Sequence, residues 1–198
     1  MLSMRIPIML RRSTTGHFGY VCPLLLLGLG ILLSFRALAQ STGSKALTVC
    51  EVFQDLQANS GRMIEVRGEL LTGRRTFALR QKDCPTKLRT GDLEWPTAID
   101  LAAAGSIQLD SPAAFSLDEK AVAAMDKLLC FLHESTASEL GVGITATFVG
   151  ELRTREVYRA KSAPDGTPYG GGFGHLGVYP AQLVYRTVKD IVIRQKPR

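Results

Sequence analysis

Residues 170–183, with the sequence GGGFGHLGVYPAQL, place a histidine and aromatic side chains on a glycine-rich backbone. The glycines of residues 172–177 match the G-x-G-x-x-G pattern of dinucleotide-binding turns. Such a turn needs a strand before it and a helix after it, because the helix N-terminus binds the pyrophosphate. Residues 178–180 are Val-Tyr-Pro, and a predicted strand follows. We therefore expect no nucleotide cofactor here, and the sequence indicates no other cofactor.

Aromatic and basic side chains alternate in and before this stretch. Aromatic rings can stack on bases or sugars, and basic groups beside them can bind phosphate. On this basis the candidate binding residues are Arg153, Arg155, Tyr158, Tyr169, Phe173, His175 and Tyr179. The structural alternative is a compact loop in which glycines adopt positive φ, the aromatics plug one end and His175 bonds to backbone carbonyls.

No catalytic constellation accompanies these residues. The chain has no G-x-S-x-G elbow and no H-E-x-x-H motif, and no second histidine lies at a useful spacing from His175. A metal-dependent hydrolase or nuclease needs clustered carboxylates. Asp100, Asp110 and Glu151 are scattered, and we expect them to be solvated surface charges. We assign no catalytic residue and no metal ligand, while a pair of Cys130 and His175 stays open.

The predicted secondary structure surrounds this stretch with strands. Thr48 and Glu51 have the spacing of a capping box that begins a helix, and Ser116 and Glu119 repeat it. Alternating and helical periodicities then predict a helix over 49–58, strands over 63–70, 76–80 and 97–101, a helix over 117–135, and strands over 144–152 and 182–194. A long loop, 154–181, joins the last two strands.

This order of elements is that of the OB-fold, a five-stranded Greek-key barrel. We predict one mainly β domain, α+β by content, over residues 48–198, with an N-terminal helix and a second helix between strands three and four. Gly68 and Gly150 would allow the strands to bend. An α+β sandwich with the same order is the rival. In the barrel, the ligand face lies on strands two and three, beside the loop 154–181.

The first 39 residues have the pattern of a secretory signal peptide. Arginines precede an apolar run at 21–35, and Ala37 and Ala39 are the small residues that a signal peptidase reads. We predict cleavage after Ala39, export to the periplasm or the extracellular space, and a flexible linker over 40–47. The apolar run approaches the length that spans a bilayer, so an uncleaved anchor in the inner membrane is the alternative.

Cleavage would change the charge of the protein. The whole chain carries 24 basic and 18 acidic residues, a net charge of +6. Residues 1–39 hold four of the basic residues and no acidic ones, which leaves 20 against 18, or +2. A nearly neutral protein argues against nucleic acid, because phosphate binding requires a basic surface. The favoured partner is an envelope glycan, a peptide or a protein, with membrane contact only through 21–35 if this segment is retained.

Three cysteines remain after residue 39: Cys50, Cys84 and Cys130. Exported proteins meet an oxidising environment, in which a pair of cysteines forms a disulfide. Cys130 lies in the apolar sequence LLCFL, where a free thiol packs as a small buried hydrophobic group. We therefore predict a disulfide between Cys50 and Cys84.

Several of these motifs together resemble a group of uncharacterised exported bacterial proteins. They are the V-C-E helix start at 49–51, the V-R-G strand at 66–68, the cysteine after the second strand and the G-F-G-H-L-G-V-Y-P-A-Q-L-V segment. The resemblance implies export and a shared architecture, and it brings no assigned activity. We predict a non-catalytic binding or envelope-associated accessory module. A structural or protein-interaction module without a small ligand is the alternative, and a metal-dependent hydrolase or nuclease is less favoured.

Overall fold

The computed structural model describes residues 45–73, 75–106, 109–132, 137 and 139–195. The predicted signal peptide, with its cleavage site, and the predicted helix end at 133–135 lie outside these residues. At Thr48 the capping box is confirmed: the Thr48 Oγ1 accepts a hydrogen bond from the Glu51 N–H, and a Glu51 carboxylate oxygen accepts one from the Thr48 N–H. Helix α1 (Val49–Gln54) begins here.

Helix α1 is shorter than the predicted 49–58. Asp55 accepts a hydrogen bond from the Ala58 N–H through its side chain, and the Asn59 side-chain amide donates to the Asp55 carbonyl. Such local bonds compete with the helix ladder, and turns follow to Gly61. The strand β1 (Leu47–Thr48) pairs with the next strand, so the predicted linker at 40–47 ends in regular structure at Leu47.

The five predicted strands are confirmed, and most of them extend beyond their predicted ends. They are β2 (Met63–Gly73), β3 (Thr76–Arg80), β6 (Ala98–Ala103), β7 (Val142–Thr154) and β10 (Ala181–Gln195). The strand β2 continues to Gly73 instead of ending at Leu70, because its pairing with β3 runs to the Gly73–Thr76 pair. Two small hairpins, β4 (Arg89–Thr90) with β5 (Leu93–Glu94) and β8 (Lys161–Ser162) with β9 (Pro168–Tyr169), complete the strands.

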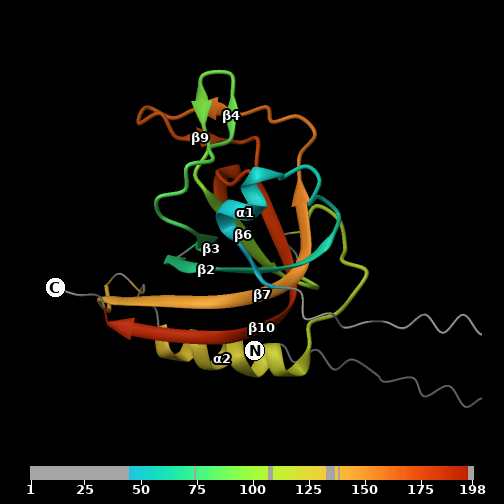
Figure 1. The fold of residues 1–198 in the computed structure, drawn as a ribbon, viewed down its shortest axis with the longest axis vertical. Helices are drawn as coiled ribbons and strands as arrows, with labels where there is room; N and C mark the ends of the chain where they lie inside the picture. The colour runs from blue at the N-terminus through green and yellow to red at the C-terminus, as the bar shows by residue number, and fades with distance from the viewer. Residues whose placement is uncertain (1–44, 74, 107–108, 133–136, 138, 196–198) are drawn as a thin grey trace, which may run out of the picture. The chain divides into compact units, whose positions relative to one another are not determined.

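The five long strands form a ring in a mixed sheet, and the protein is mainly β (Figure 1). The strand order is β2, β3, β6, β10, β7, and β7 pairs with β2 to close the circuit. All neighbours in the ring are antiparallel except β6 and β10, which are parallel. Side chains alternate between the inside and the outside of the ring, since successive residues of a strand point to opposite faces.

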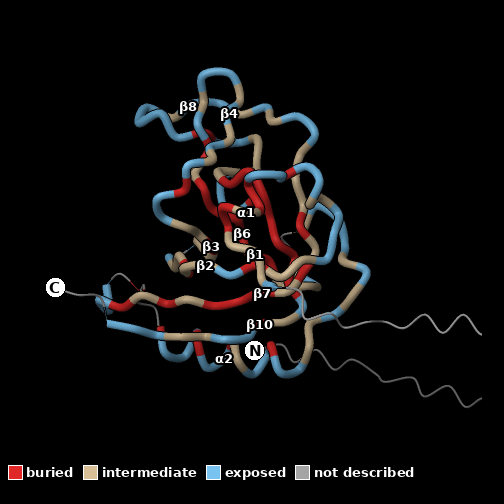
Figure 2. Tube along the Cα trace, in the orientation of Figure 1, coloured by how far each residue is buried: buried red, intermediate tan, exposed pale blue. Residues whose placement is uncertain are grey.

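The main core lies inside the ring. Leu79, Ile99, Phe148, Leu152 and Leu183 are fully buried there, and Figure 2 shows buried residues following the ring strands. The aromatic rings of Phe77 and Tyr185 meet Phe148 edge to face, with centroids 6.2 and 5.0 Å away. Val49 and Val52 of α1 join the same core.

Gly150 lets β7 and β10 approach closely. A Cβ atom at this position would lie 2.2 Å from the Val184 carbonyl oxygen. The bulge beside it belongs to β10, because the pairing moves from Tyr185–Gly150 to Thr187–Val149 and leaves Arg186 without a partner in β7. A β-bulge therefore lies opposite Gly150, and its extra residue is in the facing strand, β10.

Helix α2 (Glu119–Leu132) packs beside β10 with the predicted apolar stripe (Figure 1). Ala121, Met125, Leu128 and Leu132 are its buried residues. The predicted capping box at Ser116 is wrong, because the helix starts only at Glu119. Asp118 instead binds β10: its N–H donates to the Arg186 carbonyl, and its carboxylate accepts from Thr187 and Arg186.

Cys130 corrects another prediction. It is the free cysteine among the described residues, as expected, but it is exposed rather than buried. At 100° per residue, Cys130 lies half a turn around the helix from Ala121. The hydrophobic residues next to Cys130 in the sequence suggested a buried position, but Cys130 lies on the solvent side of α2.

Candidate functional site

The predicted disulfide between Cys50 and Cys84 is confirmed. It joins α1 to the segment after β3, with the two Cα atoms 5.6 Å apart. The Cys50 N–H also donates to the Gln81 side-chain oxygen, so the two segments are linked twice. A crosslink across this sequence separation stabilises a fold by about 4 kcal/mol in the loop-entropy model. The chain that leaves β3 is thereby held against α1.

The long predicted loop has its own structure. We call residues 155–180 the covering loop. It contains the β8–β9 hairpin, a short 3₁₀ turn at His175–Gly177 and an antiparallel bridge between Phe173 and Tyr179. Two backbone hydrogen bonds of 2.7 and 3.2 Å join Phe173 and Tyr179. The covering loop is therefore ordered, although its sequence shows neither a strand nor a helix periodicity.

Tyr179 and Phe173 point into the protein. Their exposed fractions are 8% and 6%, and Tyr179 packs on Ala78 of β3 and Ala98 of β6. These alanines alternate with inward-facing Leu79 and Ile99, so they lie on the outside of the ring. The covering loop thus occupies the outer face of β3 and β6, the two strands on which the ligand face was expected.

The two arginine candidates, Arg153 and Arg155, also have internal partners. Arg155 lies over the Phe173 ring, 4.3 Å from its centroid, and also bonds to Asp110 and to the Gly172 carbonyl. Arg153 bonds to Glu151 and to the Ser111 carbonyl.

Tyr158 is held by the packing of the loop as well. Its ring contacts Trp95 with centroids 5.1 Å apart, and its hydroxyl donates to the Pro180 carbonyl at 2.6 Å. Burial raises the pKa of this hydroxyl above its ordinary value. Tyr158 therefore fastens the covering loop to the segment before β6.

Tyr169 and His175 are the two candidates that face solvent. His175 is exposed, and its side chain forms no hydrogen bond within the part of the chain that the structure describes. The expected bonds from His175 to backbone carbonyls are therefore not found. The backbone holds this turn instead: the Gly170 N–H donates to the Leu176 carbonyl at 2.7 Å, and the Gly177 N–H donates to the Gly174 carbonyl.

Asp100 is a buried acidic residue on this face. It lies on the outer side of β6, only 8% exposed, and one carboxylate oxygen accepts a hydrogen bond from the Gln182 amide of β10 at 2.9 Å. Burial raises its pKa above the ordinary value, although the bond from Gln182 opposes the shift. The expectation that Asp100 is a solvated charge is wrong.

Gly174 explains how the covering loop can lie on Asp100. A Cβ atom at Gly174 would be 2.6 Å from an Asp100 carboxylate oxygen, and its φ of +71° is one that glycine adopts without strain. Strand alternation alone could have placed Asp100 outside the ring between Ile99 and Leu101. Gly174, which covers Asp100, is however more than seventy residues away in the sequence.

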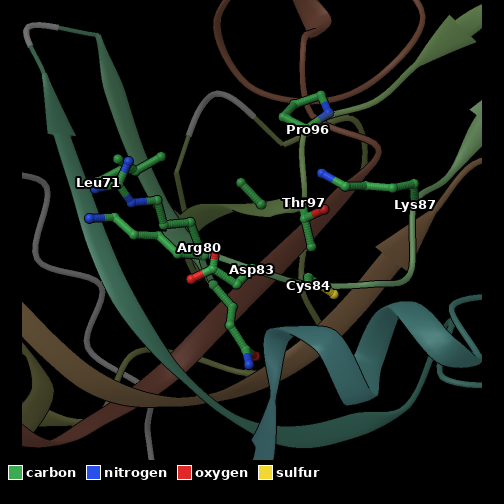
Figure 3. Close-up of a pocket in the computed structure, with 10 residues that line it drawn as sticks. Leu71, Arg80, Asp83, Cys84, Lys87, Pro96 and Thr97 are labelled. Carbon is green, nitrogen blue, oxygen red and sulfur yellow. The ribbon is translucent and has the colours of Figure 1, made fainter.

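A cavity of about 440 Å³ lies beside the covered face (Figure 3). Its lining comes from β2, the end of β3, the segment after β3, and the residues before and at the start of β6: Leu71, Arg80, Gln81, Lys82, Asp83, Cys84, Lys87, Pro96, Thr97 and Ala98. Arg80 is held by Glu69 through two hydrogen bonds of 3.0 and 3.1 Å. None of these residues except Cys84 was a candidate, since lysines and arginines near strand ends usually mark ordinary surface.

The described residues contain no cluster of three or more His, Cys, Asp or Glu side chains that could hold a metal ion. Within the same residues, no helix is both long enough and apolar enough to span a membrane. Comparison with protein-family models, curated proteins and solved structures found no match to this chain. Proposals about function therefore rest on the geometry of the chain itself.

Proposed function

We propose that this chain is an exported, non-catalytic OB-like module of the cell envelope, and that its binding partner is a protein or a peptide. The ring supports the OB-like assignment. The strands β2, β3 and β6 are successive antiparallel neighbours, and β7 returns to pair with β2, which is the Greek-key order. The fifth strand, β10, then joins β6 to β7, as a five-stranded Greek-key barrel requires.

The burial of Tyr179 on Ala78 and Ala98 is the observation that carries the choice of partner. An OB-fold binds bases or sugars on this face by stacking them on exposed aromatic rings. Here the rings of Phe173 and Tyr179 are already packed, and Tyr158 is in contact with Trp95. A glycan would have to displace the covering loop, whereas a protein can bind its outer surface as it stands.

The outer surface of the covering loop offers three adjacent side chains, which we call the tip patch: Tyr169, His175 and Leu176. Leu176 is 64% exposed and Tyr169 is 36% exposed. They are neighbours in space because the Gly170 N–H bonds to the Leu176 carbonyl. Leu176 also has a positive φ of 61°, a conformation that costs a residue with a Cβ about 1 kcal/mol. A strained, exposed apolar residue is typical of binding surfaces.

Export is supported by two observations. The disulfide between Cys50 and Cys84 is a bond that persists in oxidising compartments, and residues 1–39 have the pattern of a signal peptide. The mass of the chain recovered from the exported fraction tests this point. We expect a chain that begins at Gln40; a chain that keeps residues 21–35 would support the anchored alternative.

A photo-crosslinking amino acid in place of Tyr169 tests the tip patch in cells. We expect a discrete adduct with one protein, and we expect Leu176→Ala to reduce its yield severalfold. The matched control places the same crosslinker at Val122, an exposed apolar position of α2 with 42% exposure. Equal adducts from both positions, or a yield unchanged by Leu176→Ala, would count against the tip patch and in favour of a structural module without a partner there.

A further inference from the structure

We infer that the cavity beside β3 and β6 binds an oxyanion, a carboxylate or phosphate group carried by a small molecule, with Thr97 as the buried hydrogen-bond donor and Lys87 and Lys82 as the cationic groups. This site is separate from the tip patch. It requires no protein partner and can be measured on the purified chain.

Thr97 is the first reason. Its exposed fraction is 9%, and its Oγ1 is buried without a hydrogen-bond partner among the described residues. Buried hydroxyl groups almost always have a partner, because one left unpaired has lost its bonds to water. Thr97 lines the cavity, but its Oγ1 has almost no accessible surface, so the side chain must rotate about its Cα–Cβ bond before the hydroxyl can donate to an oxygen atom of a bound molecule.

Charge is the second reason. The lining contains three basic side chains, Arg80, Lys82 and Lys87, and one acidic side chain, Asp83. In Figure 3 the Lys87 side chain extends towards Pro96 and Thr97. A ligand near Thr97 would therefore meet the ammonium group of Lys87, whose present partner is the carboxylate of Glu94.

The two lysines can accept an anion at little cost. Lys87 lies 3.7 Å from Glu94, but both side chains are nearly half exposed, and such pairs contribute little stability. Lys82 is exposed and has no ion pair within the described residues. Arg80 is different, because Glu69 already neutralises it through two hydrogen bonds. Arg80 therefore forms a wall of the cavity rather than the anion contact.

The size and stiffness of the cavity are the third reason. A volume of about 440 Å³ lies in the range of small-molecule sites and exceeds what a bare phosphate fills. The oxyanion is then one end of a larger molecule, whose remainder lies towards Leu71. The disulfide at Cys84 and the ring of Pro96 restrict the two sides of the site, so little order is lost on binding.

Amide chemical shifts of the purified chain test the site. The probes are inorganic phosphate, glucuronate as the carboxylate, and glucose as the neutral ring of the same size, each at about 0.15 M sodium chloride, where loose surface attraction is screened. We expect saturable shifts at Thr97, Ala98 and Lys87 with phosphate or glucuronate, and none with glucose. The stronger of the two anions identifies the ligand class. Equal binding of glucose, or shifts that do not saturate, would overturn the proposal.

Two variants separate the site from general surface charge. Thr97→Val keeps the shape of the side chain and should weaken anion binding about tenfold, because it removes a hydrogen bond to a charged group. Thr97→Ser keeps the hydroxyl and should bind normally. Since Thr97→Val removes an unpaired hydroxyl, its melting temperature should not fall, which distinguishes a binding role from a structural one.

Lys87→Gln should weaken binding about fivefold, as expected for one partly screened charge. The matched control is Lys120→Gln, which makes the same change at an exposed position of α2. Equal losses from the two lysine variants, or full binding by Thr97→Val, would show that the cavity is not the site.

Discussion

Two neighbouring regions on the outside of the ring behave in opposite ways. The outer face of β3 and β6 carries the small side chains of Ala78 and Ala98, and the covering loop fills it with Tyr179. The cavity beside it is lined by lysines and a buried threonine, and no side chain of the described residues fills it. A face that resembles a binding site in sequence is thus packed, while a region that resembles ordinary surface is open.

The difference teaches how aromatic and glycine-rich loops should be interpreted. Glycines at 172 and 174 allow the covering loop to lie within contact distance of Trp95 and Asp100. The same glycines that suggest a ligand site therefore serve to bring a loop onto its own protein. Close approach of a backbone to another part of the chain has the same sequence signature as close approach to a ligand.

Tyr179→Ala should have the largest effect on this comparison. Removing a buried aromatic side chain should lower the free energy of unfolding by about 3 kcal/mol or more. It should also open the outer face of β3 and β6. Urea unfolding followed by fluorescence measures the loss, and His175→Ala, at an exposed position of the same loop, is the control, with a change below about 0.5 kcal/mol. Similar values for the two variants would mean that the loop is not packed on the ring.

Gly174→Ala should have an intermediate effect. A Cβ atom at this position would meet the Asp100 carboxylate, and the positive φ is unfavourable for alanine. We expect a loss of about 1–3 kcal/mol in the free energy of unfolding. Gly166→Ala is the matched control, because Gly166 also has a positive φ, +83°, but a Cβ atom there would have no other atom within 4 Å. If Gly174→Ala loses no more free energy of unfolding than Gly166→Ala, the close contact with Asp100 is not the reason for a glycine at position 174.

Asp100→Asn should have the smallest effect, and its sign depends on pH. Burial raises the pKa of Asp100 in the folded protein above its unfolded value, so folding favours the protonated form. The contribution of Asp100 to stability is then lost as the pH rises from its unfolded pKa through its folded pKa, and the asparagine variant lacks this loss. We expect the variant to gain relative to wild type between pH 3 and pH 7, by about 1 kcal/mol or less. A gain that does not change with pH would contradict this account.

Much of the fold could be predicted from local patterns. The Thr48–Glu51 capping box, the five strands and the buried stripe of α2 depend on residues that are close in sequence. The disulfide followed from counting cysteines and judging the surroundings of Cys130. That judgement was only half right: Cys130 is free, but helix geometry places it on the exposed side.

The sites could not be predicted in the same way, because they depend on long-range packing. Nothing in the neighbourhood of Tyr179 shows that Ala78 and Ala98 receive its ring. Asp100 is buried by Gly174 and Gln182, which come from the other end of the chain. The unpaired hydroxyl of Thr97 is visible only when every neighbouring donor and acceptor is known.

Hydrogen exchange at the Phe173 amide tests the central claim most directly. This N–H donates to the Tyr179 carbonyl at 2.7 Å inside the covering loop. If the loop is a packed part of the fold, the amide should exchange as slowly as those of β6 and β10, while the exposed amide of His175 exchanges fast. Fast exchange at Phe173 with slow exchange in the strands would show that the loop opens independently, and that the face beneath it is accessible to a ligand.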